Sequence, residues 1–156
     1  MNHYNPDSFP FPESIGHFLG KAAVLKDRVL DTQLAALEIS AAQFRVLVYI
    51  GLERANTPAD LCRELAVDSG SMTRMLDRLE RKGLLLRAPC ADDRRCVRLA
   101  LSEAGQSIYQ QSPQLGAAAM NELARGLDAQ ELQSLISLLR KLLLAHEVPA
   151  AAAEHC

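Results

Sequence analysis

Apolar residues recur at helical spacing over most of the chain, a pattern that predicts a mainly α-helical protein. From Glu13 to about Leu37, the apolar stripe is wider than a helix that covers a single core requires. A second leucine-rich helix is expected after a capping box that begins at Asp128. We therefore expect these helices to bury one side in their own chain and another side in a second subunit.

Three shorter helices are predicted between these two. Ser40 is a good N-cap for a core helix over Ala41–Arg54, and Thr57, with a proline after it, opens a helix that ends near Leu65. After a tight turn, a third helix spans Ser69–Gly83, so the last two form a helix-turn-helix. The core helix contributes five apolar residues that we expect to be buried: Phe44, Leu47, Val48, Ile50 and Leu52.

The helix over Ser69–Gly83 has a packed face and a cationic face. Its apolar stripe consists of Met72, Met75, Leu76 and Leu79. The other side carries Arg74, Asp77 and Arg81, with Arg78 on the flank. Asp68 and the small polar residues after it supply caps, and Gly83 is a suitable end. Ser, Thr and Arg side chains read base edges and phosphates, so this is a candidate recognition helix; a solvated charged face is the alternative.

Two β-strands are expected directly after this helix, at Leu84–Cys90 and Cys96–Leu101. Between them lies a charged hairpin tip, Ala91–Arg95. A helix-turn-helix followed at once by such a hairpin is a winged helix. The tip can reach the minor groove of a duplex, where the negative potential favours arginine.

The predicted fold class is mainly α with a small β-wing. Ser102 caps a further helix that runs toward Leu123, and Pro113 and Gly116 either kink this helix or divide it in two. Hydrophobic residues make up 49% of the chain and aromatic residues only 4%, which agrees with a helical domain. We expect five segments: a flexible arm (1–12), a dimerisation helix (13–39), a winged helix-turn-helix DNA-binding lobe (40–101), dimerisation helices (102–146) and a flexible tail (147–156).

The net charge of −2 conceals an asymmetry along the chain. The segment from Arg45 to Ala100 contains 11 Lys and Arg and 8 Asp and Glu, a net charge of +3, so the rest of the chain has a net charge of −5. The middle of the chain is therefore the candidate for nucleic-acid binding. Because the isoelectric point is near 6.1, binding must come from the local placement of arginines or from their doubling in a dimer.

The first residues lack the pattern of a signal peptide, and no apolar run approaches the roughly 20 residues of a membrane span, so we expect a cytoplasmic protein. The four cysteines are then expected to be reduced, and their spacing matches no zinc site. The four histidines are scattered, so we predict no metal. We find no catalytic constellation and no Gly-rich phosphate loop, and we predict neither enzymatic activity nor a cofactor.

Residues Ser40–Gly105 resemble the MarR family of bacterial regulators. The similarity lies in TPADLCRELAVDSGSMTRMLDRLERKGLLLR and in the following wing, DDRRCVRLALSEAG, whose text is similar to that of members controlling multidrug efflux. The resemblance implies a homodimeric winged helix-turn-helix protein that binds double-stranded DNA at a pseudo-palindromic operator. It also implies repression of a nearby gene, released by a small aromatic or drug-like ligand.

The resemblance assigns DNA-binding residues by position. From the recognition helix, Ser69, Ser71, Thr73 and Arg74 are expected on bases or phosphates, with Arg78 on the backbone. On the wing, Arg95 is expected in the minor groove, Asp93 orients it and Arg94 contacts phosphates. An arginine held by an aspartate loses less freedom on binding.

The sequence leaves the control of binding open. A ligand site is expected between the two lobes, with four candidate residues: His17, Lys21, Tyr49 and Tyr109. One alternative is a redox sensor in which Cys90 and Cys96, which flank the wing tip, form a disulfide. The peroxide-sensing mechanism of some family members does not transfer, because no cysteine precedes Cys62. Another alternative is a winged-helix module that binds proteins instead of DNA.

Overall fold

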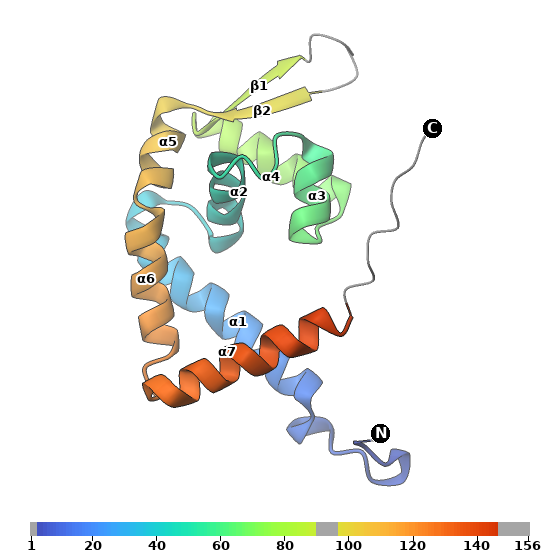
Figure 1. Ribbon diagram of the computed structural model, residues 1–156. Helices are drawn as coiled ribbons and strands as arrows, with labels where there is room; N and C mark the ends of the chain where they lie inside the picture. Colours follow the sequence, from blue (N-terminus) through green and yellow to red (C-terminus); the bar gives the residue numbers. More distant parts are fainter. Residues whose placement is uncertain (1–2, 90–96, 147–156) are drawn as a thin grey trace.

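The computed structural model describes residues 3–89 and 97–146, which form helices and one small antiparallel sheet (Figure 1). The α-helices are α1 (Ile15–Leu34), α2 (Ala41–Gly51), α3 (Pro58–Leu65), α4 (Ser69–Arg81), α5 (Glu103–Gln110), α6 (Ser112–Leu123) and α7 (Ala129–Leu144). Strands β1 (Leu85–Pro89) and β2 (Val97–Leu101) pair with Leu85 opposite Leu101 and Pro89 opposite Val97. Short 3₁₀ turns are η1 (Pro6–Ser8), η2 (Phe11–Glu13) and η3 (Ala35–Leu37). The predicted fold class, mainly α with a small β-wing, is confirmed.

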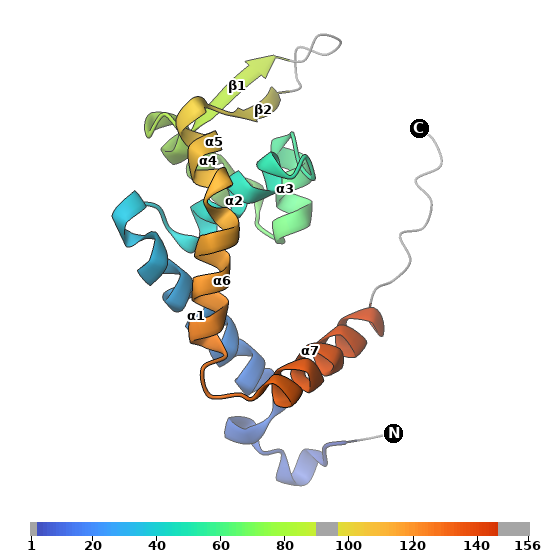
Figure 2. The ribbon, with the colours of Figure 1, turned by 60° about the vertical axis from the view of Figure 1, so that its left-hand side comes forward.

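The chain forms two lobes (Figures 1 and 2). The winged lobe contains α2, α3, α4 and the β1–β2 hairpin, and the helical lobe contains α1, α6 and α7. Helix α5 leaves the hairpin and leads into α6, which packs along α1. In the described part of the chain, no single helix is long and apolar enough to cross a membrane. Among the described residues, one bent pair, Ile15–Leu37 with Ala41–Gly51 at 80° to each other, reaches that length and composition together.

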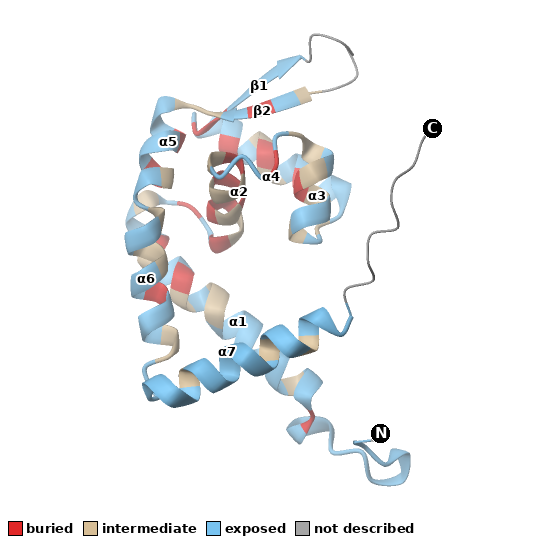
Figure 3. Cartoon of the chain, viewed as in Figure 1, coloured by how far each residue is buried: buried red, intermediate tan, exposed pale blue. Residues whose placement is uncertain are grey.

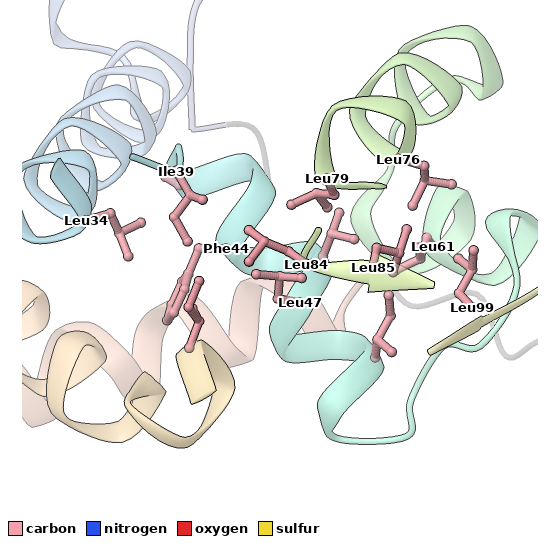
Figure 4. Packing of buried hydrophobic residues seen from close by; sticks show 14 of the residues in the cluster. Leu34, Ile39, Phe44, Leu47, Leu61, Leu76, Leu79, Leu84, Leu85 and Leu99 are labelled. Atoms are coloured by element: carbon pink, nitrogen blue, oxygen red, sulfur yellow. The ribbon is translucent and has the colours of Figure 1, made fainter. Parts of the chain in front are cut away.

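The hydrophobic core lies mainly in the winged lobe (Figure 4). Leu47 of α2 and Leu61 of α3 are fully buried against Leu76 and Leu79 of α4 and residues of the hairpin. Met72, Leu76 and Leu79 are at most 1% exposed, as predicted, while Met75 is half-buried. The prediction that Leu52 is buried is wrong, because α2 ends at Gly51 and the chain then turns at Glu53 (φ 56°), leaving Leu52 52% exposed.

Local sequence signals set the helix boundaries. Ser40 accepts a hydrogen bond from the backbone N–H of Gln43, whose side chain bonds back to Ser40, and Asp128 forms the same capping box at α7. Thr57 caps α3 as predicted. Gly83 adopts φ +69°, a conformation that glycine tolerates without strain, directly after α4.

Of the two possibilities predicted after Ser102, one bent helix or two pieces, the structure has two helices, α5 and α6, which meet at Gln111. Pro113 lies in the first turn of α6, where its missing N–H costs no helical hydrogen bond. The proline therefore marks the start of a new helix instead of a kink inside one.

Helix α7 is apolar but exposed (Figure 3). Within residues 3–89 and 97–146, no residue of α7 is buried, and Leu138 and Leu143 are 66% and 64% exposed. Together with the start of α1, this helix borders an apolar groove of about 620 Å³. The groove is lined by Ile15, Phe18, Leu19, Ala22, Leu135, Leu138, Leu139, Lys141, Leu142 and Ala145. An exposed apolar surface of this kind is typical of a protein interface.

Candidate nucleic-acid interface

Asp68 fixes the beginning of α4. Its carboxylate accepts a hydrogen bond from the backbone N–H of Ser71 at 2.8 Å. Bonds from the backbone and hydroxyl of Ser71 hold the pKa of Asp68 below its ordinary value of 3.8. The first turn of α4 is therefore stabilised by an ionised cap, which suits the positive end of the helix dipole.

The outer face of α4 carries the polar residues that the sequence assigned to DNA. Ser69, Thr73, Arg74 and Arg78 are exposed, and Ser71 is half-buried. The guanidinium of Arg74 donates to the hydroxyl of Ser71 at 2.9 Å, and the Thr73 hydroxyl donates to the carbonyl of Ser69 at 2.8 Å. The structure thus brings these five predicted residues together on one helix, with Arg74 already held in place.

Arg87 connects the wing to α4. From β1, its guanidinium lies 2.7 Å from the carboxylate of Asp77 and 3.5 Å from that of Glu80. This pairing neutralises the two acidic side chains on α4, which would otherwise repel phosphates. It also ties the base of the hairpin to the candidate recognition helix.

A polar hollow of about 440 Å³ lies between α4 and the start of α2. Three cationic side chains contribute to it, those of Arg74, Arg78 and Lys82, together with the half-buried Met75. Its remaining lining residues are Ser40, Ala42, Gln43 and Ser71. The hollow shares two arginines with the DNA-binding prediction, so an anion bound there would compete for them.

Several predicted residues lie outside the described part of the chain. These are Asp93, Arg94 and Arg95 of the wing tip and the redox candidates Cys90 and Cys96. The strands that lead to and from the tip are paired as expected. Cys62, in α3, is half-buried and packs against the core.

The four ligand candidates occupy different surroundings. Tyr49 packs partly buried against the core from α2, and the ring of Tyr109 lies against Gly51 at the end of the same helix. His17 lies in the first turn of α1, edge-on to Phe18, in a hollow lined by residues of the N-terminal segment. Lys21 is exposed on α1, and the hollow at His17 includes none of the other three candidates.

Sequence reasoning missed two parts of this region, the Arg87 bridge and the cationic hollow. Both depend on segments that are distant in the sequence, since Arg87 lies ten residues from Asp77 and the hollow joins α2 to α4. An arginine within a strand does not reveal from the sequence which residue it pairs with. The cationic residues of a helix likewise do not reveal from the sequence which other helix packs beside them.

Known proteins resemble this chain in sequence over most of its length. A model of the MarR family matches residues 39–97. The multiple antibiotic resistance protein MarR of Escherichia coli K12 is 41% identical over 130 residues, which cover 83% of this chain and 90% of that protein. The protein of the same name from Salmonella typhimurium LT2 is 42% identical over 119 residues, covering 76% and 83%.

Solved structures agree with these relationships. A mutant of E. coli MarR complexed with operator DNA has a TM-score of 0.77 and 41% identity, covering 87% of this chain and 99% of that one. A structure of Bordetella bronchiseptica BpsR, whose DNA binding is regulated by 6-hydroxynicotinic acid, has a TM-score of 0.74. It is 23% identical and covers 86% and 96%, so it supports the fold alone.

The Asp68 cap predicts a measurable pKa. In an NMR titration of the full chain, the Asp68 carboxyl should titrate below 3.8, because the ionised form is the better acceptor for the Ser71 N–H. The cap then stabilises the fold above pH 3.8, and this contribution is lost as the pH falls through the lower folded pKa. Ser71→Ala retains the backbone N–H and should reverse the shift only in part. An Asp68 pKa at or above 3.8 would contradict the cap.

Proposed function

Because this chain belongs to the MarR family of DNA-binding transcriptional regulators, we propose that it binds a pseudo-palindromic operator and represses a nearby gene. The observation that carries this proposal is the exposed polar and cationic face of α4, set beside a hairpin that Arg87 ties to it. A helix with such a face fits the major groove. We propose that the protein works in the cytoplasm, where a bacterial operator is found.

The proposed DNA contacts come from both parts of the winged lobe. Ser69, Ser71, Thr73 and Arg74 would read bases or phosphates, and Arg78 would hold the backbone. Support for this assignment is that four of these residues are exposed on α4, while the half-buried Ser71 accepts a hydrogen bond from Arg74. From the wing, Arg95 would enter the minor groove with Asp93 beside it, and Arg94 would contact phosphates, as the family resemblance implies.

The protein acts as a homodimer, as its family does. We propose that α1 and α7 supply the interface, with α6 packed behind α1. The apolar groove between α1 and α7 and the absence of any buried residue in α7 among the described residues support this placement. Burying one leucine side chain contributes about 1.5–3 kcal/mol, so a second copy over this face would gain considerably.

We propose further that a small aromatic or drug-like ligand releases the DNA. The cationic hollow beside α4 favours an aromatic acid, because a carboxylate can pair with Arg74 or Arg78 while the ring contacts Met75. His17, Lys21, Tyr49 and Tyr109 remain predicted ligand residues elsewhere in the protein. In relatives, E. coli MarR is named for multiple antibiotic resistance and BpsR responds to a nicotinic acid derivative.

DNA binding should depend on salt and on the arginines of α4. Using duplexes selected by the purified protein, we expect the logarithm of affinity to fall linearly with the logarithm of salt concentration. Arg78→Ala should weaken binding to all sequences and reduce the slope by about 1 per subunit, whereas Arg74→Ala should cost about 1–3 kcal/mol and relax base preference. Fluorescence anisotropy measures both quantities.

Arg125→Ala is the matched control, because Arg125 is an exposed arginine that pairs with Glu122 at 3.1 Å on the helical lobe. It should leave both affinity and salt slope unchanged. If the wild type binds no duplex, the proposal fails and the protein-interaction module takes its place. If Arg125→Ala weakens binding as much as Arg78→Ala, the assignment of α4 is wrong.

An aromatic acid should displace the duplex. Salicylate, added to the protein–duplex complex at constant ionic strength, is expected to raise the apparent Kd in proportion to its concentration once the cationic hollow fills. Benzyl alcohol, which has the ring without the carboxylate, should have a much smaller effect, since it cannot pair with a guanidinium. Equal effects of the two compounds would refute recognition of the carboxylate.

The dimer interface is tested by charges on α7. Leu135→Lys combined with Leu139→Lys should produce monomers that bind DNA poorly, because two buried ammonium groups are costly in an apolar interface. Sedimentation velocity measures the oligomeric state. Gln133→Lys, on the other side of the same helix, is the control and should remain dimeric. An intact dimer after the double substitution would refute this interface.

A further inference from the structure

The two lobes meet at the joint between α1 and α2. The helices are inclined at 80° and connected by η3 and the residues up to Ser40, with Glu38 in the left-handed conformation (φ 54°). Helix α1 belongs to the proposed dimer interface, while α2 is the central helix of the winged lobe. The angle at this joint, together with the α5–α6 connection, therefore sets where the winged lobe stands relative to a second subunit.

Two carboxylates of α1 hold α2 at this joint. The carboxylate of Asp27 accepts hydrogen bonds from the two terminal guanidinium nitrogens of Arg45, at 2.5 and 3.5 Å. Burial raises the pKa of Asp27, but hydrogen bonds from Arg45 and Lys26 overcome this effect and leave the pKa lowered. Asp31, one turn further along α1, accepts a hydrogen bond from the backbone N–H of Ala41 at 2.6 Å, so it holds the first turn of α2.

A third contact connects the joint to the recognition helix. The ammonium of Lys82, at the end of α4, donates to the backbone carbonyl of Glu38 in the connector. The first turn of α2 also borders the same hollow as Arg74 and Arg78 of α4. The contacts of Asp27 and Asp31 thus tie α1 to α2, and the contact of Lys82 ties the end of α4 to the connector between them.

Apolar packing at this joint involves few residues of α1. The only residues of α1 that are buried, among those described, are Leu30 and Leu34, and burial of apolar surface has no preferred direction. Hydrogen bonds are directional, and the two-pronged contact of Arg45 adds geometric specificity. Because Asp27 and Arg45 are 41% and 34% exposed, their pair contributes little stability. The effect of this pair is to orient α2 relative to α1.

We infer that Asp27 and Asp31 are positioning residues that set the distance between the two recognition helices of the dimer, and hence which spacing of operator half-sites the protein accepts. This inference rests on the proposed function. Each base pair inserted between half-sites moves one of them by about 3.4 Å and turns it by about a tenth of a turn. A fixed joint cannot follow that movement, whereas a loosened joint can.

The experiment compares operator spacings, using the full-length protein and a duplex selected by the wild type. Variants of this duplex carry one base pair more or one fewer between the half-sites. For the wild type, a change of one base pair should weaken binding at least about tenfold, or about 1.4 kcal/mol. For Asp27→Ala and for Asp31→Ala, the loss should be less than about threefold, because the lobes can adjust.

Matched variants separate positioning from general damage. Arg45→Ala removes the same bond as Asp27→Ala, so each should flatten the spacing profile equally, and the double variant should be no flatter than either. Glu122→Gln breaks the ion pair with Arg125 within the helical lobe and should keep the wild-type profile. Thermal unfolding and sedimentation check that each variant remains folded and dimeric.

The outcomes are distinct for the inference and for the proposed function. A steep spacing profile in Asp27→Ala and Asp31→Ala overturns the inference. So does an equal loss of affinity at every spacing, which a merely structural role would produce. If the wild type binds no duplex at any spacing, the proposed function itself fails. A flat profile in the joint variants beside a steep one in Glu122→Gln supports the inference.

Discussion

Burial of one side of α4 is the constraint on which the rest of this structure depends. Met72, Leu76 and Leu79 are held under α2, α3 and the hairpin, so the opposite side of the helix must face solvent. That side carries Arg74 and Arg78, and its first turn is fixed by Asp68. The packing that makes the winged lobe stable therefore also exposes the residues that we propose to bind DNA. The packed face and the proposed recognition face are thus two sides of one helix.

A second requirement is that two such helices stand at a defined distance. The chain provides for this with an apolar helix that it cannot bury by itself, since α7 has no buried residue within the described chain. Helix α1 shares the groove with α7 and also holds α2 through Asp27 and Asp31. If α1 and α7 form the dimer interface as proposed, dimerisation and DNA recognition are linked through α1. Within the winged lobe, the ion pairs of Arg87 with Asp77 and Glu80 likewise hold two elements together, because they join strand β1 to α4.

The sequence predicts the features that depend on local spacing. The caps at Ser40, Thr57 and Asp128 are read from neighbours three residues away, and the stripe of α4 follows from helical geometry. The burial of Leu52 could not be predicted, because the sequence pattern does not fix the last residue of a helix. Helix α2 ends at Gly51, one residue before Leu52. The hydrogen bond between Arg45 and Asp27 spans 18 residues and could not be predicted from the sequence, since long-range pairs depend on how the helices pack. The exposed polar face of α4 was therefore predictable, and its role in DNA binding stays a prediction, whereas the contacts that position this helix could not be predicted.

The most direct test of this account is a hydroxyl-radical footprint of the purified protein on the DNA upstream of its own gene. A dimer with two fixed recognition helices should protect two short patches on one face of the duplex, about one helical turn apart, related by an approximate two-fold axis. A single protected patch, or protection with no symmetry, would contradict a dimer that reads two half-sites. Uniform cleavage at low salt would contradict DNA binding altogether.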